Sequence, residues 1–119
     1  MRLNPRDSRS YDIYHLLGVA YFVGRQYSDG IRWALRALND KPEMLQPRTN
    51  LVNCYVGANQ IAKARGALAE GQAHAPDYFR ARLKAGAQMY ARYKDNERAT
   101  TFFRIAAGLE DPSAAEALR

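Results

Sequence analysis

Residues 14–42, YHLLGVAYFVGRQYSDGIRWALRALNDKP, decide the fold, because their pattern returns in residues 48–76, RTNLVNCYVGANQIAKARGALAEGQAHAP. Both stretches end in a proline, Pro42 and Pro76, and the separation of these two prolines is the period of the pattern. Aliphatic, aromatic and small residues recur at the same distances before the prolines: Leu17 and Leu51, Tyr21 and Tyr55, Gly30 and Ala64, Ala34 and Leu68, Ala37 and Gly71. A fixed period of about 34 residues is typical of proteins built from repeated helical hairpins.

Within these stretches the apolar residues follow the spacing of a helix. One helix face is occupied, at i, i+3, i+4, i+7 and i+8, by Tyr14, Leu17, Gly18, Tyr21 and Phe22. No segment alternates with the period of two that marks a half-buried strand. We therefore expect an all-α chain, with helices over residues 11–24, from Ser28 to before Pro42, and over 45–58, 61–74, 78–92 and 95–107.

Three residues are expected to cap these helices at their N-termini. Ser28, Asp77 and Asp95 each stand at the start of a predicted helix, and each carries an oxygen that can accept from the first free backbone amides. Pro47 lies in the first turn of its predicted helix, where the missing N–H is tolerated. Residues 113–116 have the spacing of a capping box, which predicts one last short turn or helix.

Small residues indicate that the predicted helices pack closely in pairs. Gly18 on one helix and Gly30 and Ala34 on the next let the two backbones approach, and bulkier side chains there would force them apart. We expect about three helical hairpins stacked side by side in a single domain. Its parts are a lead-in (1–10), three repeats (11–44, 45–78 and a degenerate 79–112) and a C-terminal cap (113–119).

The composition is that of one small folded domain. The chain has 119 residues, of which 47% are hydrophobic and 25% charged, a balance that excludes wholesale disorder. No window approaches the roughly 18 consecutive apolar residues of a membrane span. The first ten residues lack the apolar core of a secretory signal, and the single cysteine, Cys54, excludes an internal disulfide. We expect a cytoplasmic protein without a membrane partner.

The recurring residues resemble the tetratricopeptide repeat (TPR) family. The first block matches the family pattern with Tyr14, Leu17, Gly18, Tyr21, Gly30, Ala34, Ala37 and Pro42, and the second with Leu51, Cys54, Tyr55, Ala64, Leu68, Gly71 and Pro76. A third, degenerate block matches, with one residue inserted after Pro76, through Leu83, Gly86, Ala87, Tyr90, Ala99, Phe103 and Ala106. The resemblance implies a right-handed superhelix of about three hairpins that binds other proteins.

The two ends of the chain extend this resemblance. Residues 1–7 resemble the tail of one more repeat, which suggests a helix pair upstream. Residues 80–112 are similar to the ends of TPR modules in bacterial multidomain regulators, among them class III adenylate and guanylate cyclases and winged-helix transcriptional activators. No cyclase metal-binding aspartate pair or nucleotide loop is present, so only the TPR part of that architecture is expected here.

No group of residues suggests catalysis. His15 and His74 are far apart and lack a cysteine or carboxylate at ligand spacing, so no metal site is expected. Cys54 falls at a small-residue position of a helix pair, which predicts a buried and inert thiol. There is no phosphate-binding glycine loop and no serine elbow. We therefore expect neither enzymatic activity nor a cofactor.

The resemblance also implies where a partner would bind. In a TPR superhelix the first helix of each hairpin lines a concave groove, and the corresponding residues here are Asp12, His15, Val19, Phe22, Thr49, Asn53, Arg80, Lys84, Gln88 and Arg92. Such a groove would run from apolar through amide-rich to basic. It would hold an extended or helical peptide, with acidic groups near its basic end. Asn50 matches the middle position of the set with which chaperone-binding TPR proteins hold a terminal carboxylate, but His15, Val19, Ala81 and Ala85 stand at the other positions, so that activity is not expected.

Two other functions remain open at this stage. Apolar surface at the N-terminal end and in the degenerate third repeat would favour self-association. The net charge of +6 includes a local +5 over residues 78–104, where seven basic residues face two acidic ones (7 − 2 = 5). That excess would instead favour binding of nucleic acid or another anionic ligand.

Overall fold

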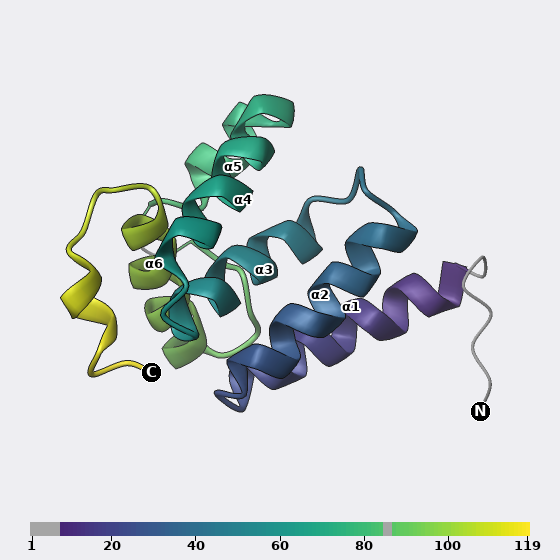
Figure 1. Cartoon of the computed structure of the whole chain (residues 1–119), viewed down its shortest axis with the longest axis horizontal. Coiled ribbons are helices and arrows are strands. Elements are labelled where there is room, and N and C mark those ends of the chain that lie inside the picture. Colours follow the sequence, from purple (N-terminus) through teal and green to yellow (C-terminus); the bar gives the residue numbers. More distant parts are fainter. Residues whose placement is uncertain (1–7, 85–86) are drawn as a thin grey trace.

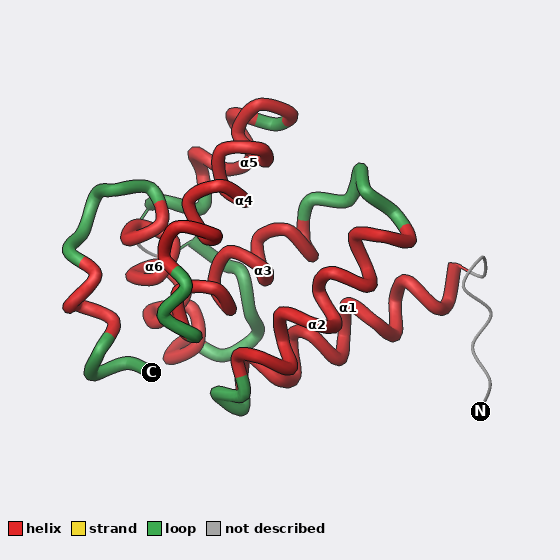
Figure 2. Tube along the Cα trace, in the orientation of Figure 1, coloured by secondary structure: helices red, strands yellow, loops and turns green. Residues whose placement is uncertain are grey.

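The computed structural model describes residues 8–84 and 87–119, and all regular structure in these residues is helical (Figure 1, Figure 2). The helices are α1 (Ser8–Val23), α2 (Tyr27–Asp40), α3 (Gln46–Gly57), α4 (Ile61–His74), α5 (Pro76–Ala81) and α6 (Tyr93–Ala106), followed by the short 3₁₀ helix η1 (Pro112–Ala115). The prediction of an all-α chain is confirmed. None of the described helices combines the length and apolar character needed to cross a membrane.

The first two hairpins, α1–α2 and α3–α4, are built alike. Helices α1 and α3 end at equivalent positions of the two sequence copies. Helices α2 and α4 begin at equivalent positions and also end at equivalent positions. In the turns, Arg25 and Asn59 both have a left-handed backbone, with φ of 61° and 60°. The next residues, Gln26 and Gln60, each donate from the backbone amide to the carbonyl five residues earlier, at 2.8 Å. The period read from the sequence is therefore also a period of the backbone.

Close helix packing in these hairpins depends on glycine. A Cβ atom added at Gly30 of α2 would lie 2.6 Å from the Sγ atom of Cys54 on α3. One added at Gly18 of α1 would lie 3.0 Å from the Nδ2 atom of Asn50. Because both distances are shorter than an ordinary contact, no side chain fits there without movement of a neighbour. The two glycines bring α1 and α2 within reach of the polar side chains of α3.

The core continues from these hairpins into α6, which packs against α3 and α4. Phe102, Phe103 and Ile105 of α6 are fully buried, and Phe22 of α1 meets Phe102 with ring centroids 6.1 Å apart. Ala115 of η1 is also fully buried. Burial of several phenylalanines in one cluster supplies a large share of the hydrophobic stabilisation of so small a domain.

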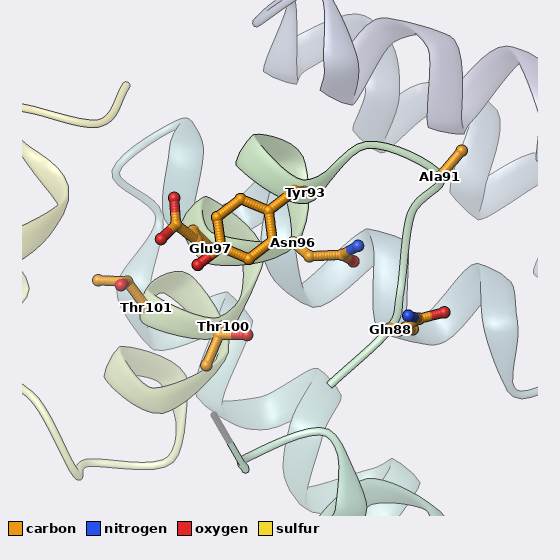
Figure 3. Close-up of a pocket in the computed structure, with 7 residues that line it drawn as sticks. All are labelled: Gln88, Ala91, Tyr93, Asn96, Glu97, Thr100 and Thr101. Carbon is orange, nitrogen blue, oxygen red and sulfur yellow. The ribbon is translucent and has the colours of Figure 1, made fainter. Parts of the chain in front are cut away.

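The predicted fifth helix, 78–92, is wrong over most of its length. Helix α5 ends at Ala81, and residues 87–92, which we call the Tyr90 segment, reach α6 without helical turns (Figure 1, Figure 3). Residues 85–86, including the matched Gly86, lie outside the described residues. Tertiary contacts replace the helix: Tyr90 enters the core, and the side chain of Asn96 binds the backbone that a helix would have satisfied.

As a result, the predicted third repeat, 79–112, contains one full-length helix in place of two. Short α5 packs against α4, whereas α6 packs against both α3 and α4. The radius of gyration is 13.4 Å, close to the roughly 13.5 Å of a compact domain of this length. The part of the predicted lead-in that covers residues 1–7 lies outside the described residues.

The predicted N-terminal caps are wrong. Helix α2 begins one residue before Ser28, and its N-cap position, held by Gln26, makes no side-chain capping hydrogen bond. Asp77 and Asp95 lie inside the first turns of α5 and α6, where each pairs with an arginine three residues later. Because both helices begin earlier than predicted, neither aspartate stands at an N-cap position.

The prediction for Pro47 is confirmed, and the prediction for the C-terminal cap is confirmed only in part. Pro47 does occupy the first turn of α3, as predicted. At the C-terminus the short 3₁₀ helix forms, but the cap is Asp111, whose side chain accepts a hydrogen bond from the backbone amide of Ser113 at 2.8 Å.

Candidate functional site

A pocket of about 230 Å³ lies between α1, α3, the α5 region and the Tyr90 segment, and we call it the central pocket. Its lining residues are His15 and Val19 from α1, Gln46, Thr49 and Asn50 from α3, Tyr78 and Arg82 from the α5 region, and Gln88, Met89 and Tyr90 from the Tyr90 segment. Most of these side chains carry polar groups. The pocket is therefore suited to hydrogen bonding.

Four of the predicted groove residues come together in the central pocket: His15, Val19, Thr49 and Gln88. They belong to three separate parts of the chain. Val19 provides an apolar wall, and the hydroxyl of Thr49 is already used, because it donates to the carbonyl of Leu45 at 3.2 Å.

Two other predicted groove residues lie beneath the surface instead. Phe22 and Asn53 are fully buried, so neither side chain faces a groove. The reason is Tyr90, whose ring lies flat on Phe22 with centroids 4.5 Å apart and an interplanar angle of 11°. Asn53 donates from Nδ2 to the Tyr90 hydroxyl at 3.3 Å. Phe22 and Asn53 are thus the floor on which Tyr90 rests.

The remaining predicted groove residues, Asp12, Arg80, Lys84 and Arg92, are exposed and do not line the central pocket. Arg80 pairs with Asp77 at 2.9 Å, and Arg92 lies 4.0 Å from Asp95. The predicted basic end of the groove is absent from the described residues, because the helix that would have aligned these side chains does not form.

The hydroxyl of Tyr90 is held between two amides of α3. It donates to Oδ1 of Asn50 at 2.5 Å and accepts from Asn53. Burial raises the pKa of Tyr90 well above its usual value, so the hydroxyl keeps the proton that it donates. Among the residues that the structure describes, Nδ2 of Asn50 and Oδ1 of Asn53 have no hydrogen-bond partner.

Asn96 of α6 holds the backbone of the Tyr90 segment. Its Oδ1 atom accepts from the amides of Met89 and Tyr90, and its Nδ2 atom donates to the carbonyl of Tyr90, all at 2.7 Å. One side chain thus satisfies three backbone groups that would otherwise be paired in a helix.

A buried ion pair lies on the other side of Phe22. Arg98 and Asp95 of α6 are both buried, with Nη2 and Oδ1 3.1 Å apart. Arg98 also donates from Nη1 to the hydroxyl of Tyr27 at 2.7 Å, and its guanidinium lies 4.2 Å from the ring centroid of Phe22. In the sequence, nothing in its charge distinguishes Arg98 from the surface arginines. Its position three residues after Asp95, however, is the spacing of an ion pair on one helix.

Two polar atoms of the residues that line the central pocket are buried without a hydrogen-bond partner among the described residues. Desolvation lowers the pKa of His15, against the opposing effect of Asp12, so the half-buried ring is neutral at pH 7. In the described part of the chain, Nδ1 of His15 and Nδ2 of Asn50 lack partners. Arg82 stacks on Tyr78, 4.2 Å from the ring centroid, and brings a positive charge to the rim.

A second pocket, of about 530 Å³, lies between the Tyr90 segment and α6 (Figure 3). Gln88 and Ala91 line it from the segment, and α6 contributes Tyr93, Asn96, Glu97, Thr100 and Thr101. Gln88 belongs to both pockets. The Tyr90 segment therefore separates the two cavities and forms a wall of each.

The described residues contain no group of three or more His, Cys, Asp or Glu side chains placed to hold a metal ion. Cys54 is buried, as predicted, and burial raises the pKa of its thiol to about 12. A thiol with so high a pKa is a poor nucleophile, because little thiolate forms near neutral pH.

Comparison of the chain with protein-family models, with curated proteins and with solved structures gave no significant match. Its function therefore has to be inferred from the residues and from the geometry of the two pockets.

Proposed function

We propose that this chain is a non-catalytic protein–protein interaction module that binds an extended peptide segment of a partner in and around the central pocket. Within this proposal the two hairpins are TPR-type repeats and the chain is part of a superhelix. The recurrence of helix ends, turn conformation and turn hydrogen bonds at equivalent positions of the two copies supports that relationship.

The observation that carries the proposal is the unpartnered amide of Asn50. This side chain lines the central pocket, and the residue is only 2% exposed, yet its Nδ2 donor has no partner among the described residues. A buried donor without an acceptor costs about 1–3 kcal/mol, so such groups are rare unless something binds them. Nδ2 lies beneath the pocket surface, next to Gly18 of α1, so a peptide carbonyl from a partner would supply the missing acceptor once α1 and α3 separate locally.

The size of the central pocket favours a peptide over a small molecule. Sites for small ligands usually measure about 300–1,000 Å³, whereas this pocket has about 230 Å³. That space suits one side chain or a short stretch of backbone. Amide side chains at Gln46 and Gln88 line it as well, and can pair with the backbone of an extended chain.

The proposal is tested by selecting peptides from a display library on the immobilised protein and measuring their affinities by fluorescence anisotropy. Val19→Glu places a charge on the apolar wall of the pocket and should weaken binding at least about tenfold, or ~1.4 kcal/mol. Ala62→Glu, an exposed change on α4, is the matched control and should leave affinity unchanged. Failure to select any peptide, or equal affinities for both variants, would contradict the proposal.

Self-association is a second candidate, because the first hairpin exposes large aliphatic side chains. Leu16 on α1 is 65% exposed and Leu35 on α2 is 44% exposed. Nucleic-acid binding is less well supported: Arg98 is buried, and Arg104 donates to the carbonyl of Leu83 at 3.3 Å. Retention on duplex DNA that falls steeply with salt would favour that alternative.

As part of the same proposal, we place the module in the cytoplasm, within a larger bacterial regulator of the kind that includes class III cyclases. The resemblance of residues 80–112 to the ends of such modules supports this placement. A single buried cysteine, Cys54, fits a reducing compartment.

A further inference from the structure

Tyr90 is held as the anchor of a bound peptide would be held. It belongs to a segment without helical turns, and the groups that hold its side chain come from α1 and α3, the first helices of the two hairpins. Figure 1 shows the light-green chain after α5 passing beside α3 on its way to α6. The segment therefore lies against the first helices of both hairpins.

The contacts around Tyr90 are selective for tyrosine. The flat face of Phe22 suits any aromatic ring, but the acceptor Oδ1 of Asn50 and the donor Nδ2 of Asn53 both meet the hydroxyl. A phenylalanine in the same place would leave both amide atoms without that partner. Sites built to bind a hydroxyl discriminate strongly against side chains that lack one.

The segment uses only part of what the site offers. With Tyr90 seated, Nδ2 of Asn50 and Oδ1 of Asn53 remain unpaired among the described residues, although both side chains are almost fully buried. Both atoms lie beneath the surface, and Nδ2 of Asn50 lies next to Gly18 of α1. The hydrogen bonds that hold the Tyr90 hydroxyl therefore leave part of each amide unsatisfied.

The attachment of the segment is also local. Apart from the Tyr90 side chain, two amides hold residues 89 and 90: Asn96 clamps their backbone, and Asn53 meets the sulfur of Met89 at 3.8 Å. Gln88, Ala91 and Arg92 do not share the burial of Tyr90: all three are exposed. A competitor has to replace one buried side chain and one amide clamp.

From these observations we infer that the Tyr90 segment is a resident, intramolecular ligand of the groove. The external partner is an extended peptide whose tyrosine takes the place of Tyr90 between Phe22, Asn50 and Asn53. This inference rests on the proposed function, and it names the anchor residue of the partner and the contact that limits its affinity.

The test uses a fluorescein-labelled peptide with the sequence of residues 87–92, AQMYAR, capped at both ends, and the full chain carrying Tyr90→Ala. Anisotropy titration should show at least about tenfold tighter binding to Tyr90→Ala than to the unaltered chain, because the site is empty. A peptide with phenylalanine for tyrosine should bind Tyr90→Ala at least about tenfold more weakly. Tyr93→Ala is the matched control, since Tyr93 is 73% exposed and its removal leaves the site filled.

Because Tyr90→Ala also removes core contacts, its helicity is checked by circular dichroism, and Asn96→Ala serves as a second variant. Asn96→Ala keeps Tyr90 but removes three hydrogen bonds to the segment, so it should raise peptide affinity as well. If Tyr90→Ala is unfolded, Asn96→Ala decides. The inference is overturned if a folded variant binds the peptide no better than Tyr93→Ala does, or if the tyrosine and phenylalanine peptides bind equally.

The two proposals fail in different ways. Library peptides that lose affinity with Val19→Glu but do not compete with the hexapeptide would preserve the proposed function and overturn this inference. Conversely, tyrosine-selective binding of the hexapeptide to Tyr90→Ala, with no library peptide bound by the unaltered chain, would show that Tyr90 occupies a tyrosine site that no external peptide enters, and would overturn the proposed function together with the external partner.

Discussion

Three asparagines show how one side-chain type performs different tasks according to its position. Asn50 and Asn53, buried on α3, hold the hydroxyl of Tyr90, whereas Asn96, at the start of α6, holds the backbone of the same residue. An amide is suited to both tasks because it carries a donor and an acceptor. Replacement of Asn50 or Asn53 by an aliphatic residue would leave the Tyr90 hydroxyl with one partner fewer.

At the residue scale, we predict that Cys54 is unreactive in the native protein. Burial raises the pKa of its thiol to about 12, so almost no thiolate exists at pH 8. Reaction with a chromogenic disulfide reagent should be slow in buffer and fast in concentrated urea, where the chain is unfolded. Rapid, stoichiometric reaction of the native protein would contradict the burial of this thiol.

His15 predicts a pH dependence of stability. Desolvation lowers its pKa in the folded state below the roughly 6.5 of the unfolded chain. Well above the pKa of the unfolded chain, the imidazole is neutral in both states and does not change the free energy of unfolding. As the pH falls below that pKa, the unfolded chain binds the proton more readily than the folded one, so the free energy of unfolding decreases. Urea denaturation at pH 7.5 and pH 5 should show a smaller loss for His15→Gln than for the unaltered chain.

The control for that experiment is His74→Gln, because His74 is exposed at the end of α4. It should leave the loss of stability between the two pH values unchanged. An identical loss in all three proteins would show that protonation of His15 does not contribute.

At the scale of helices, two glycines predict opposite responses to the same substitution. Gly30→Ala on α2 places a Cβ atom 2.6 Å from Sγ of Cys54 and should destabilise the protein by about 1–3 kcal/mol. Gly66→Ala on α4 meets no described atom within 4 Å and should stabilise it by about 1 kcal/mol, since alanine is the better helix former. Urea denaturation measures both, and the same sign for both variants would refute the packing described here.

Helix α6 depends on its buried ion pair. Arg98→Ala leaves Asp95 buried without its main partner and should cost about 3–5 kcal/mol in the free energy of unfolding. Arg92→Ala is the control, because Arg92 is 74% exposed and 4.0 Å from the same carboxylate, so its loss should cost at most about 1 kcal/mol. Similar costs for the two variants would argue against a buried pair.

At the scale of the whole molecule, the missing helix makes the domain compact. Because α6 packs against α3 and α4, the chain closes on itself, with a radius of gyration of 13.4 Å and extents of 42 × 29 × 24 Å. A continuous stack of three hairpins would leave the faces of α1 and α3 open, whereas here Tyr90 covers them. Residues of its segment line two of the pockets.

Small-angle X-ray scattering tests this shape. We expect a radius of gyration close to 13.4 Å that does not change with concentration, if the protein is a monomeric interaction module. An increase with concentration would favour self-association. Leu16→Glu should abolish such an increase if the exposed face of α1 forms the contact.

The sequence predicted best those elements that depend on contacts between residues close together along the chain. The predicted helix 61–74 agrees with α4 at both ends, because apolar spacing and Pro76 are local signals. The helix predicted over 78–92 failed, because Tyr90 contacts Asn50 and Phe22, which are distant from it along the chain. Of the predicted groove residues, His15, Val19, Thr49 and Gln88 meet at one pocket, whereas Phe22 and Asn53 are buried beneath Tyr90.

By itself, the sequence determined that this chain is helical and that its first two hairpins repeat with one fixed period. Those features depend on contacts within one or two turns of helix and on glycines at fixed positions. Only the tertiary structure decided that residues 87–92 leave the helix and occupy the face of α1 and α3. The physical reason is that two sets of interactions compete for these residues. The hydrogen bonds of a local helix are replaced by the burial of one aromatic ring and by hydrogen bonds to the side-chain amides of Asn50, Asn53 and Asn96.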